Sequence, residues 1–194
     1  MTVCCPPETR SRANSCMPTY LALFRALNVG GRNILPMREL VALLEELGAR
    51  SVRTYIQSGN AVFTTGGANP ARLAGRIAAA VARRRGFTPH VQLLRLADLE
   101  RAIRANPFPE AVAEPQTLHL GFLAAAPAKP DLPALEALRR PSERYRLAGR
   151  VFYLHAPEGV ARSRLAAGAE RVLGVALTDR NWRTVCALRD LASG

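Results

Sequence analysis

The sequence predicts an α+β protein built from two ferredoxin-like halves, each with the element order β-α-β-β-α-β. Three observations lead to this prediction. Apolar runs typical of strands alternate with segments whose apolar residues recur at helical spacing. The same order of elements occurs twice along the 194 residues. Each half also contains a hairpin signal between its two helices. We expect a connecting helix between the halves and a final helix at the C-terminus.

The first half is expected to span residues 18–95. Its first apolar run, residues 20–27, ends at Asn-Val-Gly-Gly, which is typical of a buried strand. The next segment has helical spacing between Pro36, which a first helical turn tolerates, and Gly48, which can end a helix. The remaining expected elements are strands 52–57 and 61–65 joined by a two-residue turn at Ser58-Gly59, an Ala-rich helix at 70–85 and a strand at 89–95.

The second half is expected to span residues 117–194. A connecting segment, 96–116, precedes it, with a helix at 96–105 that ends at an Asn-Pro-Phe-Pro breaker. A Tyr-x-x-x-Gly pattern occurs in both expected hairpins and weakly supports the duplication. The expected elements of this half are a strand at 117–123, a helix at 132–139, a hairpin of 143–147 and 150–155, a helix at 162–173, a strand at 175–178 and a helix at 181–192.

Two polar turns of the first half are expected to lie side by side. In this fold the first two strands run parallel, and the third lies antiparallel between them. The loop that leaves the first strand, residues 28–33, and the turn before the third strand, residues 57–60, therefore fall at the same end of the sheet. Residues that are distant in sequence would become neighbours there.

The charge of the chain is basic and uneven. The formal net charge is +12, from 26 Arg and one Lys against 15 acids, and the choice of Arg over Lys can follow from composition alone. Residues 18–95 carry eleven Arg and three acids, a net of +8, whereas residues 96–194 carry fourteen basic and eleven acidic residues, a net of +3. Residues 66–95 hold six Arg and no acid. This distribution favours an anionic partner, although solubility alone also uses net charge.

The cysteines and the leader indicate a cytoplasmic, reduced protein. Cys4, Cys5 and Cys16 lie in a Pro/Ser/Arg-rich leader, and Cys186 lies in the last expected helix, so no disulfide framework is visible. We expect residues 1–17 to be a disordered tail, because they lack the apolar run of a secretory signal. No stretch is long and apolar enough to span a bilayer, so we expect no membrane partner.

Four separated motifs occur in order along the chain. They are RALNVGGRN with Pro36-Met37 at residues 25–37, RTYIQSGNAVF at 53–63, YLHAPEG followed by RSRL at 153–165, and TDRNWRTV at 178–185. Together they resemble the domain-of-unknown-function 1697 family over roughly residues 18–191. The resemblance implies a bacterial protein with two ferredoxin-like halves, and it implies no activity. Ala26 stands where the family usually has glycine. Arg32 stands where lysine is usual, which keeps the charge but presents a planar fork.

The polar turns hold the strongest candidates for a ligand site. Gly30-Gly31 leads toward a helix start, where free N–H groups and the helix dipole favour an anion; the alternative is a tight turn that needs glycine. Neither the P-loop nor the Rossmann motif is present. The segment around Ser58 offers amides and a hydroxyl, or simply turn chemistry. The predicted ligand-binding residues are Arg25, Asn28, Gly30, Gly31, Arg32, Gln57, Ser58, Asn60, Arg180 and Asn181.

Other polar positions carry less weight. Asn181 is equally expected to cap the last helix, with Trp182 in the core. Arginines on the 70–85 helix, and the Arg-Ser-Arg start of the 162–173 helix, are either solvated surfaces or anion contacts. We expect no metal and no cofactor, because the three histidines have no ligand spacing. These are His90, His119 and His155.

Three functions stay open at this point. The first is binding of a phosphorylated or polyanionic ligand, a small molecule or a nucleic acid, although the RNA-recognition strand motif is missing. The second is an enzyme on a small phosphate-bearing substrate, with loop amides that stabilise charge; no acid, base or nucleophile is identifiable for it. The third is an interaction or scaffolding protein whose polar turns only shape the fold. The oligomeric state is not determined by the sequence.

Overall fold

The computed structural model describes residues 17–28, 30–57, 59–66 and 69–194. Apart from Met17, the expected N-terminal tail lies outside the described residues. The first half forms a sheet with strand order β2-β3-β1-β4, in which every neighbouring pair is antiparallel. Its elements are β1 (Thr19–Arg25), α1 (Met37–Glu46), β2 (Arg50–Thr54), β3 (Asn60–Thr64), α2 (Pro70–Arg85) and β4 (His90–Arg95).

The second half repeats this plan with strand order β6-β7-β5-β8. Its elements are β5 (Leu118–Leu123), α4 (Leu132–Leu138), β6 (Arg144–Ala148), β7 (Val151–His155), α5 (Arg164–Leu173) and β8 (Leu177–Asn181). The connecting helix is α3 (Leu96–Arg104), the final helix is α6 (Trp182–Ser193), and two short 3-10 helices are η1 (Pro109–Ala113) and η2 (Val160–Arg162). The predicted fold class, two ferredoxin-like halves with a connecting and a C-terminal helix, is confirmed.

Helix α2 shows how local sequence sets an element. The Asn69 side chain accepts from the N–H groups of Ala71 and Arg72, which caps the start, and Pro70 occupies the first helical position. Gly86 ends the helix with φ +76°, a left-handed conformation that glycine adopts without strain. The buried residues recur at helical spacing, so one side of α2 packs on the sheet. They are Leu73, Ile77, Ala80 and Val81.

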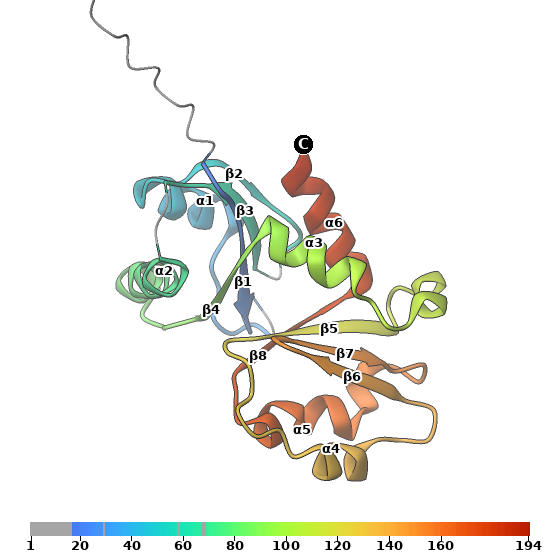
Figure 1. The fold of residues 1–194 in the computed structure, drawn as a ribbon. Coiled ribbons are helices and arrows are strands. Elements are labelled where there is room, and N and C mark those ends of the chain that lie inside the picture. Colours follow the sequence, from blue (N-terminus) through green and yellow to red (C-terminus); the bar gives the residue numbers. More distant parts are fainter. Residues whose placement is uncertain (1–16, 29, 58, 67–68) are drawn as a thin grey trace, which may run out of the picture.

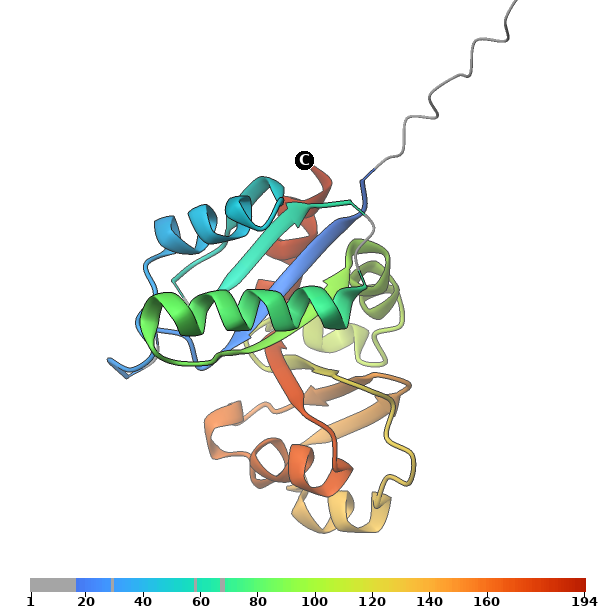
Figure 2. The ribbon, with the colours of Figure 1, turned by 90° about the vertical axis from the view of Figure 1, so that its left-hand side faces the viewer.

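The two halves are joined by a shared apolar core. Helices α1 and α2 cover one face of the first sheet, and α4 and α5 cover one face of the second (Figures 1 and 2). Helices α3 and α6 lie in the angle between the sheets (Figure 1). There they pack against Leu21, Leu23 and Val62 of the first sheet and against a buried set of the second. This set comprises Leu118, Leu120, Phe122 and Tyr153.

The connection from β2 to β3 is longer than the two-residue turn that the sequence predicts at Ser58-Gly59. Thr54 pairs with Ala61, and the Tyr55 N–H bonds to the Asn60 carbonyl at 3.0 Å, so Ile56 and Gln57 follow the last residue of β2 that pairs with β3. Ser58 lies outside the described residues, and the Gly59 carbonyl accepts from the Phe24 N–H at 2.8 Å. Gly59 therefore continues the ladder toward β1 and does not belong to a tight two-residue turn.

The last strand also differs from the prediction. The expected strand at 175–178 is instead β8, Leu177–Asn181, because pairing with β5 continues from Leu123↔Leu177 to His119↔Asn181. Arg180 and Asn181 therefore lie in a strand, and Asn181, the last residue of that strand, also caps α6. The helix expected from residue 162 begins at Arg164, after η2, where the Ser163 hydroxyl caps the Ala166 N–H. Within the described residues, no helix has both the length and the apolar character needed to cross a membrane.

Candidate functional site

The two polar turns lie side by side, as the topology predicts. The Asn28 side-chain amide donates to the main-chain carbonyl of Gln57 at 2.7 Å, across 29 residues of sequence. Both turns lie at the end of the sheet where β1 finishes and β3 begins. The inference that these bends are neighbours is confirmed.

Most of the amides in these turns hold the turns together. The Asn28 Oδ1 accepts from the Leu35 N–H at 2.7 Å, and its Nδ2 donates to the Leu35 carbonyl at 2.9 Å. The Asn33 side chain bonds in the same way to the carbonyl of Ala26 at 3.2 Å. Asn28 and Asn33 both have left-handed backbones, with φ near +55°, which asparagine tolerates better than most residues. These two amides are therefore committed to the conformation of the loop.

Asn60 and Arg180 form a buried link between the halves. Asn60 is fully buried, its Nδ2 donates to the Tyr55 carbonyl at 3.3 Å, and its Oδ1 accepts from Nε of Arg180 at 2.6 Å. Burial lowers the pKa of the Arg180 guanidinium, and the charge of Asp179 opposes this shift. The other acceptors of this guanidinium are three carbonyls, those of Phe24 at 2.8 Å, Gly59 at 3.4 Å and Asp179 at 2.7 Å.

Of the other predicted site residues, some are bonded to other groups of the protein and others are exposed. Arg25 pairs with Glu170 of α5, and Asn181 accepts from the Thr184 N–H at 3.0 Å as the cap of α6. Gly30 and Gly31 have positive φ and open space around them. Ser58 lies outside the described residues. Arg32 and Gln57 are exposed, beside the exposed aliphatic side chains of Ile34 and Ile56; we call these four residues the turn surface.

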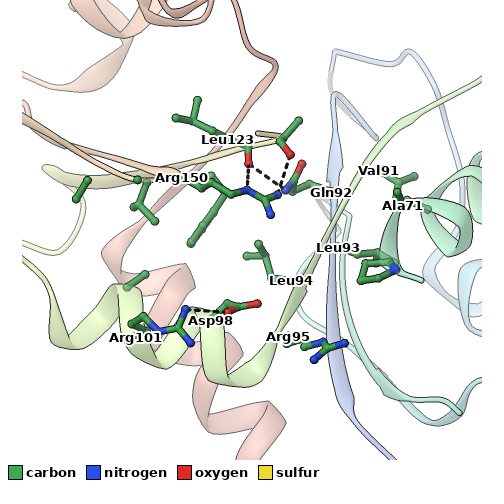
Figure 3. A pocket seen from close by; sticks show the side chains of 18 of the residues that line it. Ala71, Val91, Gln92, Leu93, Leu94, Arg95, Asp98, Arg101, Leu123 and Arg150 are labelled. Carbon is green, nitrogen blue, oxygen red and sulfur yellow. Dashed lines mark hydrogen bonds and ion pairs between the residues drawn. The ribbon is translucent and has the colours of Figure 1, made fainter. Parts of the chain in front are cut away.

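A cavity of about 900 Å³ lies elsewhere, between the two halves. It is bounded by the start of α2, the whole of β4, helix α3, the end of β5 and the β6–β7 turn (Figure 3). We call it the inter-half cleft. None of the ten predicted site residues is among its described lining. Its described lining consists of Asn69, Pro70, Ala71, Ala74, residues 90–95, Asp98, Arg101, Ala102, Ala105, residues 122–124, residues 148–151 and Tyr153.

The inter-half cleft combines an apolar floor with positive charge. Leu94 lies in its middle, with Arg150 beside Gln92 on one side and Arg101 beside Asp98 on the other (Figure 3). Among its described lining residues there are three arginines, including Arg95, and one acid, so their formal charge is +2. The Asp98 carboxylate is paired with Arg101 at 3.2 Å. The capped N-terminus of α2 opens on the same cleft and adds partial positive charge.

Two polar side chains of the cleft are bonded to main-chain carbonyls. Arg150 donates to the carbonyls of Leu123 at 3.1 Å and Ala124 at 2.8 Å, which fixes its guanidinium at the wall. The Tyr153 hydroxyl donates to the Ala102 carbonyl at 2.8 Å, and burial raises the pKa of Tyr153 to about 12. This tyrosine stays protonated and bonded at neutral pH. The described residues also contain no group of three or more His, Cys, Asp or Glu side chains that could hold a metal ion.

Sequence reasoning missed this cleft because its wall is assembled from four segments that are far apart in the sequence. A signal was present in one of them, since Arg95 ends the run of residues 66–95 that holds six Arg and no acid. The opposite wall comes from the β6–β7 turn and the end of β5, whose positions depend on how the two halves pack. No periodicity within either half encodes that packing.

Comparison with known proteins assigns the chain to a family without an established function. The family model described as "Protein of unknown function (DUF1697)" matches residues 17–153. The chain belongs to the DUF1697 family. The DUF1697 match includes every described residue that lines the inter-half cleft, whereas Arg180 and Asn181 lie beyond it. It also confirms the family resemblance carried by the sequence motifs.

A solved structure has the same fold as this DUF1697 protein. It is described as the structure of conserved bacterial protein SP0830 from Streptococcus pneumoniae, with a TM-score of 0.67 and 23% sequence identity. The match covers 92% of this chain and 99% of that chain. At this identity the likeness concerns the fold alone. A search of curated proteins gave no match.

Proposed function

We propose that this DUF1697 protein binds an anionic ligand with an apolar part in the inter-half cleft, and that it binds this ligand without converting it. The observation that carries the proposal is the convergence of Arg95, Arg101 and Arg150 on one apolar cavity. They come from the β4–α3 junction, from α3 and from the β6–β7 turn. A volume of about 900 Å³ falls within the range of ligand pockets, roughly 300–1,000 Å³.

The chemistry of the lining defines the ligand class. An anionic group would approach Arg95, whose guanidinium attracts negative charge, and the positive end of the α2 dipole. The apolar part would cover Leu94 and Val151, which line the same space. Carboxylates, sulfonates and phosphates share this chemistry.

The covered sheet faces argue against recognition of RNA by a ferredoxin-like sheet. RNA-recognition domains stack bases on an open sheet face. In the first half, α1 and α2 bury one face, and Leu21 and Val62 on the other face belong to the core shared with α3 and α6. A catalytic function is less well supported than binding, because the one carboxylate among the described lining residues, Asp98, is paired with Arg101.

The turn surface is a second candidate anion site. Ile56 has φ +51° and is 53% exposed, which is uncommon for a β-branched residue and often accompanies a functional position. Ile34 is 57% exposed nearby, and Arg32 supplies a charge. We rank it second because no cavity of comparable size is described there and Asn28, Asn33 and Asn60 already have partners.

A fluorescent amphipathic anion tests the proposal. Anilinonaphthalene sulfonate joins a sulfonate to aromatic rings, and we expect its fluorescence to rise to saturation with native protein and its affinity to fall with added salt. The double variant Arg95→Gln/Arg101→Gln should bind about tenfold more weakly, since two charge interactions of roughly 0.7 kcal/mol each would be lost. Arg76→Gln/Arg83→Gln is the matched control, because both residues are exposed on α2 outside the described lining.

Two results would contradict the proposal. One is unchanged affinity in the Arg95/Arg101 double variant. The other is equal weakening in the Arg76/Arg83 control, which would indicate a diffuse effect of net charge. Weakening only in Arg32→Gln would instead assign the ligand to the turn surface.

A further inference from the structure

Strand β4 is an open edge of the first sheet. In the described part of the chain it pairs with β1 alone, and the pairing runs without interruption from Arg25↔His90 to Tyr20↔Arg95. Hydrogen bonds along an antiparallel pair involve alternate residues. One known hydrogen bond of β1 therefore determines which residues of β1 bond to β3 and which bond to β4.

The alternation leaves three β4 residues with outward backbone groups. The Phe24 N–H bonds to Gly59 beyond the start of β3, so Phe24 and, by alternation, Ala22 and Tyr20 face β3. Leu21, Leu23 and Arg25 then face β4, where their partners are Leu94, Gln92 and His90. The N–H and C=O groups of Val91 and Leu93 and the N–H of Arg95 point away from the sheet. The carbonyl of Arg95, the N-cap residue of α3, is instead the first acceptor of that helix.

The other edge of this sheet is protected against pairing, whereas β4 is not. The β2–β3 register shifts between Arg50 and Arg53, and Ser51 has φ +52°, so the β2 edge is irregular. Bulges and charged residues are the usual means of protecting an edge. Over its six residues β4 has a regular register and no such irregularity.

The open edge of β4 faces the inter-half cleft along its whole length. All six of its residues, His90–Arg95, line the cavity. Six extended residues span about 20 Å. The cleft walls restrict access to this edge, so a single extended chain fits the geometry better than another sheet.

We infer that the inter-half cleft binds an extended acidic peptide segment as an added strand on β4. This inference rests on the proposed function and names its ligand class. Main-chain hydrogen bonds to Leu93 and Arg95 would give the segment its direction, and its alternate side chains would point to opposite faces. Charge complementarity selects acidic side chains, because one face presents Arg101 and Arg150 and the edge ends at Arg95.

Peptide backbone methylation separates strand addition from simple charge attraction. The probe is a pool of hexapeptides in which Glu or Asp alternates with Val, Ile, Phe or Tyr, titrated by fluorescence anisotropy. N-methylation at alternate positions removes either the N–H groups that face β4 or those that face solvent. We expect methylation at one set of alternate positions to weaken peptide binding at least about tenfold. Methylation at the other set should leave the affinity nearly unchanged.

Two substitutions at Arg95 test whether its backbone N–H donates to the bound peptide. Arg95 has φ −82° and ψ 150° and precedes α3, close to the φ of about −65° that proline requires. Arg95→Ala removes the charge, and Arg95→Pro removes the charge and the outward N–H. We expect the proline variant to bind the peptides about three- to tenfold more weakly than the alanine variant, and both to bind anilinonaphthalene sulfonate equally.

The outcomes distinguish this inference from the proposed function. Strand addition is overturned if the sulfonate binds saturably at the cleft but no peptide binds. It is also overturned if the peptides of the two methylation sets bind with equal affinity. Both results leave the anion site intact. Absence of both sulfonate and peptide binding overturns both. If circular dichroism shows that Arg95→Pro is unfolded, the two sets of N-methylated peptides still test strand addition on native protein.

Discussion

Nε of Arg180 donates a hydrogen bond to Oδ1 of Asn60 at 2.6 Å, although 120 residues separate them in sequence. Arg180 belongs to β8 of the second half, and Asn60 begins β3 of the first. The same guanidinium reaches the Phe24 carbonyl near the end of β1 at 2.8 Å. A single half-buried arginine therefore ties the last strand of one sheet to two central strands of the other. It also fixes the end of the sheet from which the turn surface projects.

Replacing Arg180 should destabilise the protein more than it affects the cleft. Arg180→Leu leaves the Asn60 amide and two carbonyls of the first half without these donors, at a cost of about 2–4 kcal/mol in the free energy of unfolding. For a protein of this size the melting temperature should fall by roughly 5–15 °C. Thermal unfolding followed by circular dichroism measures this change.

Arg183→Leu is the matched control for Arg180. Arg183 is exposed in the first turn of α6, so its replacement should change the free energy of unfolding by less than about 0.5 kcal/mol. Equal melting temperatures for the two variants would show that the Arg180 bonds add nothing to stability.

Asn28 and Gln57 should differ in what their side chains do. Asn28→Ala removes the bonds to both backbone groups of Leu35 and to the Gln57 carbonyl, and it places alanine at φ +56°. We expect a loss of about 2–3 kcal/mol in the free energy of unfolding. Gln57→Ala should cost less than about 0.5 kcal/mol, because its side chain is exposed. Urea denaturation measures both, and similar losses would contradict this division of roles.

The pair formed by buried His119 and exposed Asp179 should make stability depend on pH. Nδ1 of His119 lies 2.8 Å from Oδ2 of Asp179, and its Nε2 lies 3.0 Å from the Gln116 carbonyl, so both ring nitrogens face acceptors. Burial alone lowers the pKa of His119, but the hydrogen bond and charge of Asp179, with the Gln116 carbonyl, outweigh it and raise the pKa. The pair holds β5 to β8, next to Arg180.

The sign follows from this raised pKa. A group whose folded-state pKa exceeds its unfolded value, about 6.5 for histidine, adds stability that is fully present below that value and is lost as pH rises through the folded pKa. The difference in unfolding free energy between native protein and Asp179→Asn should therefore be larger at pH 5.5 than at pH 8.5. Urea denaturation at the two pH values measures it, and a constant difference would show that the pair does not titrate in this way.

Gly59 should be far less replaceable than Gly30. A Cβ at Gly59 would lie 2.7 Å from Cβ of Phe24 and 3.0 Å from Cβ of Leu27, on a backbone with φ +76°. Gly59→Ala should cost about 3 kcal/mol or more, from the left-handed backbone and the overlap together. Gly30→Ala meets no atom within 4 Å and should cost only the backbone strain, about 1 kcal/mol. Melting temperatures that fall equally would contradict the packing described here.

The sequence predicted well those features that depend on residues of a single half. The adjacency of Asn28 and Gln57 follows from strand order alone, and strand order follows from the repeated pattern of apolar segments. The cap of α6 was also predicted, because Asn181 directly precedes a segment with helical spacing.

The sequence predicted poorly those features that depend on contacts between the two halves or between a turn and a sheet. Asn60 was expected to face a ligand, and it is buried under Arg180 from the other half. The Tyr-x-x-x-Gly pattern of the two hairpins does not align, because Tyr55 follows β2 whereas Tyr145 lies within β6. The inter-half cleft exists only after α3 and the β6–β7 turn have packed beside β4.

A nuclear magnetic resonance titration tests the central claim most directly. Amide chemical shifts of isotopically labelled native protein would be followed during addition of anilinonaphthalene sulfonate. The account predicts saturable shift changes concentrated in β4, in α3 around Arg101 and in the turn at Gly149 and Arg150, with Gly30 and Gln57 unchanged. Changes confined to Gly30, Gly31 and Gln57, or no saturable change anywhere, would contradict an anion site between the two halves.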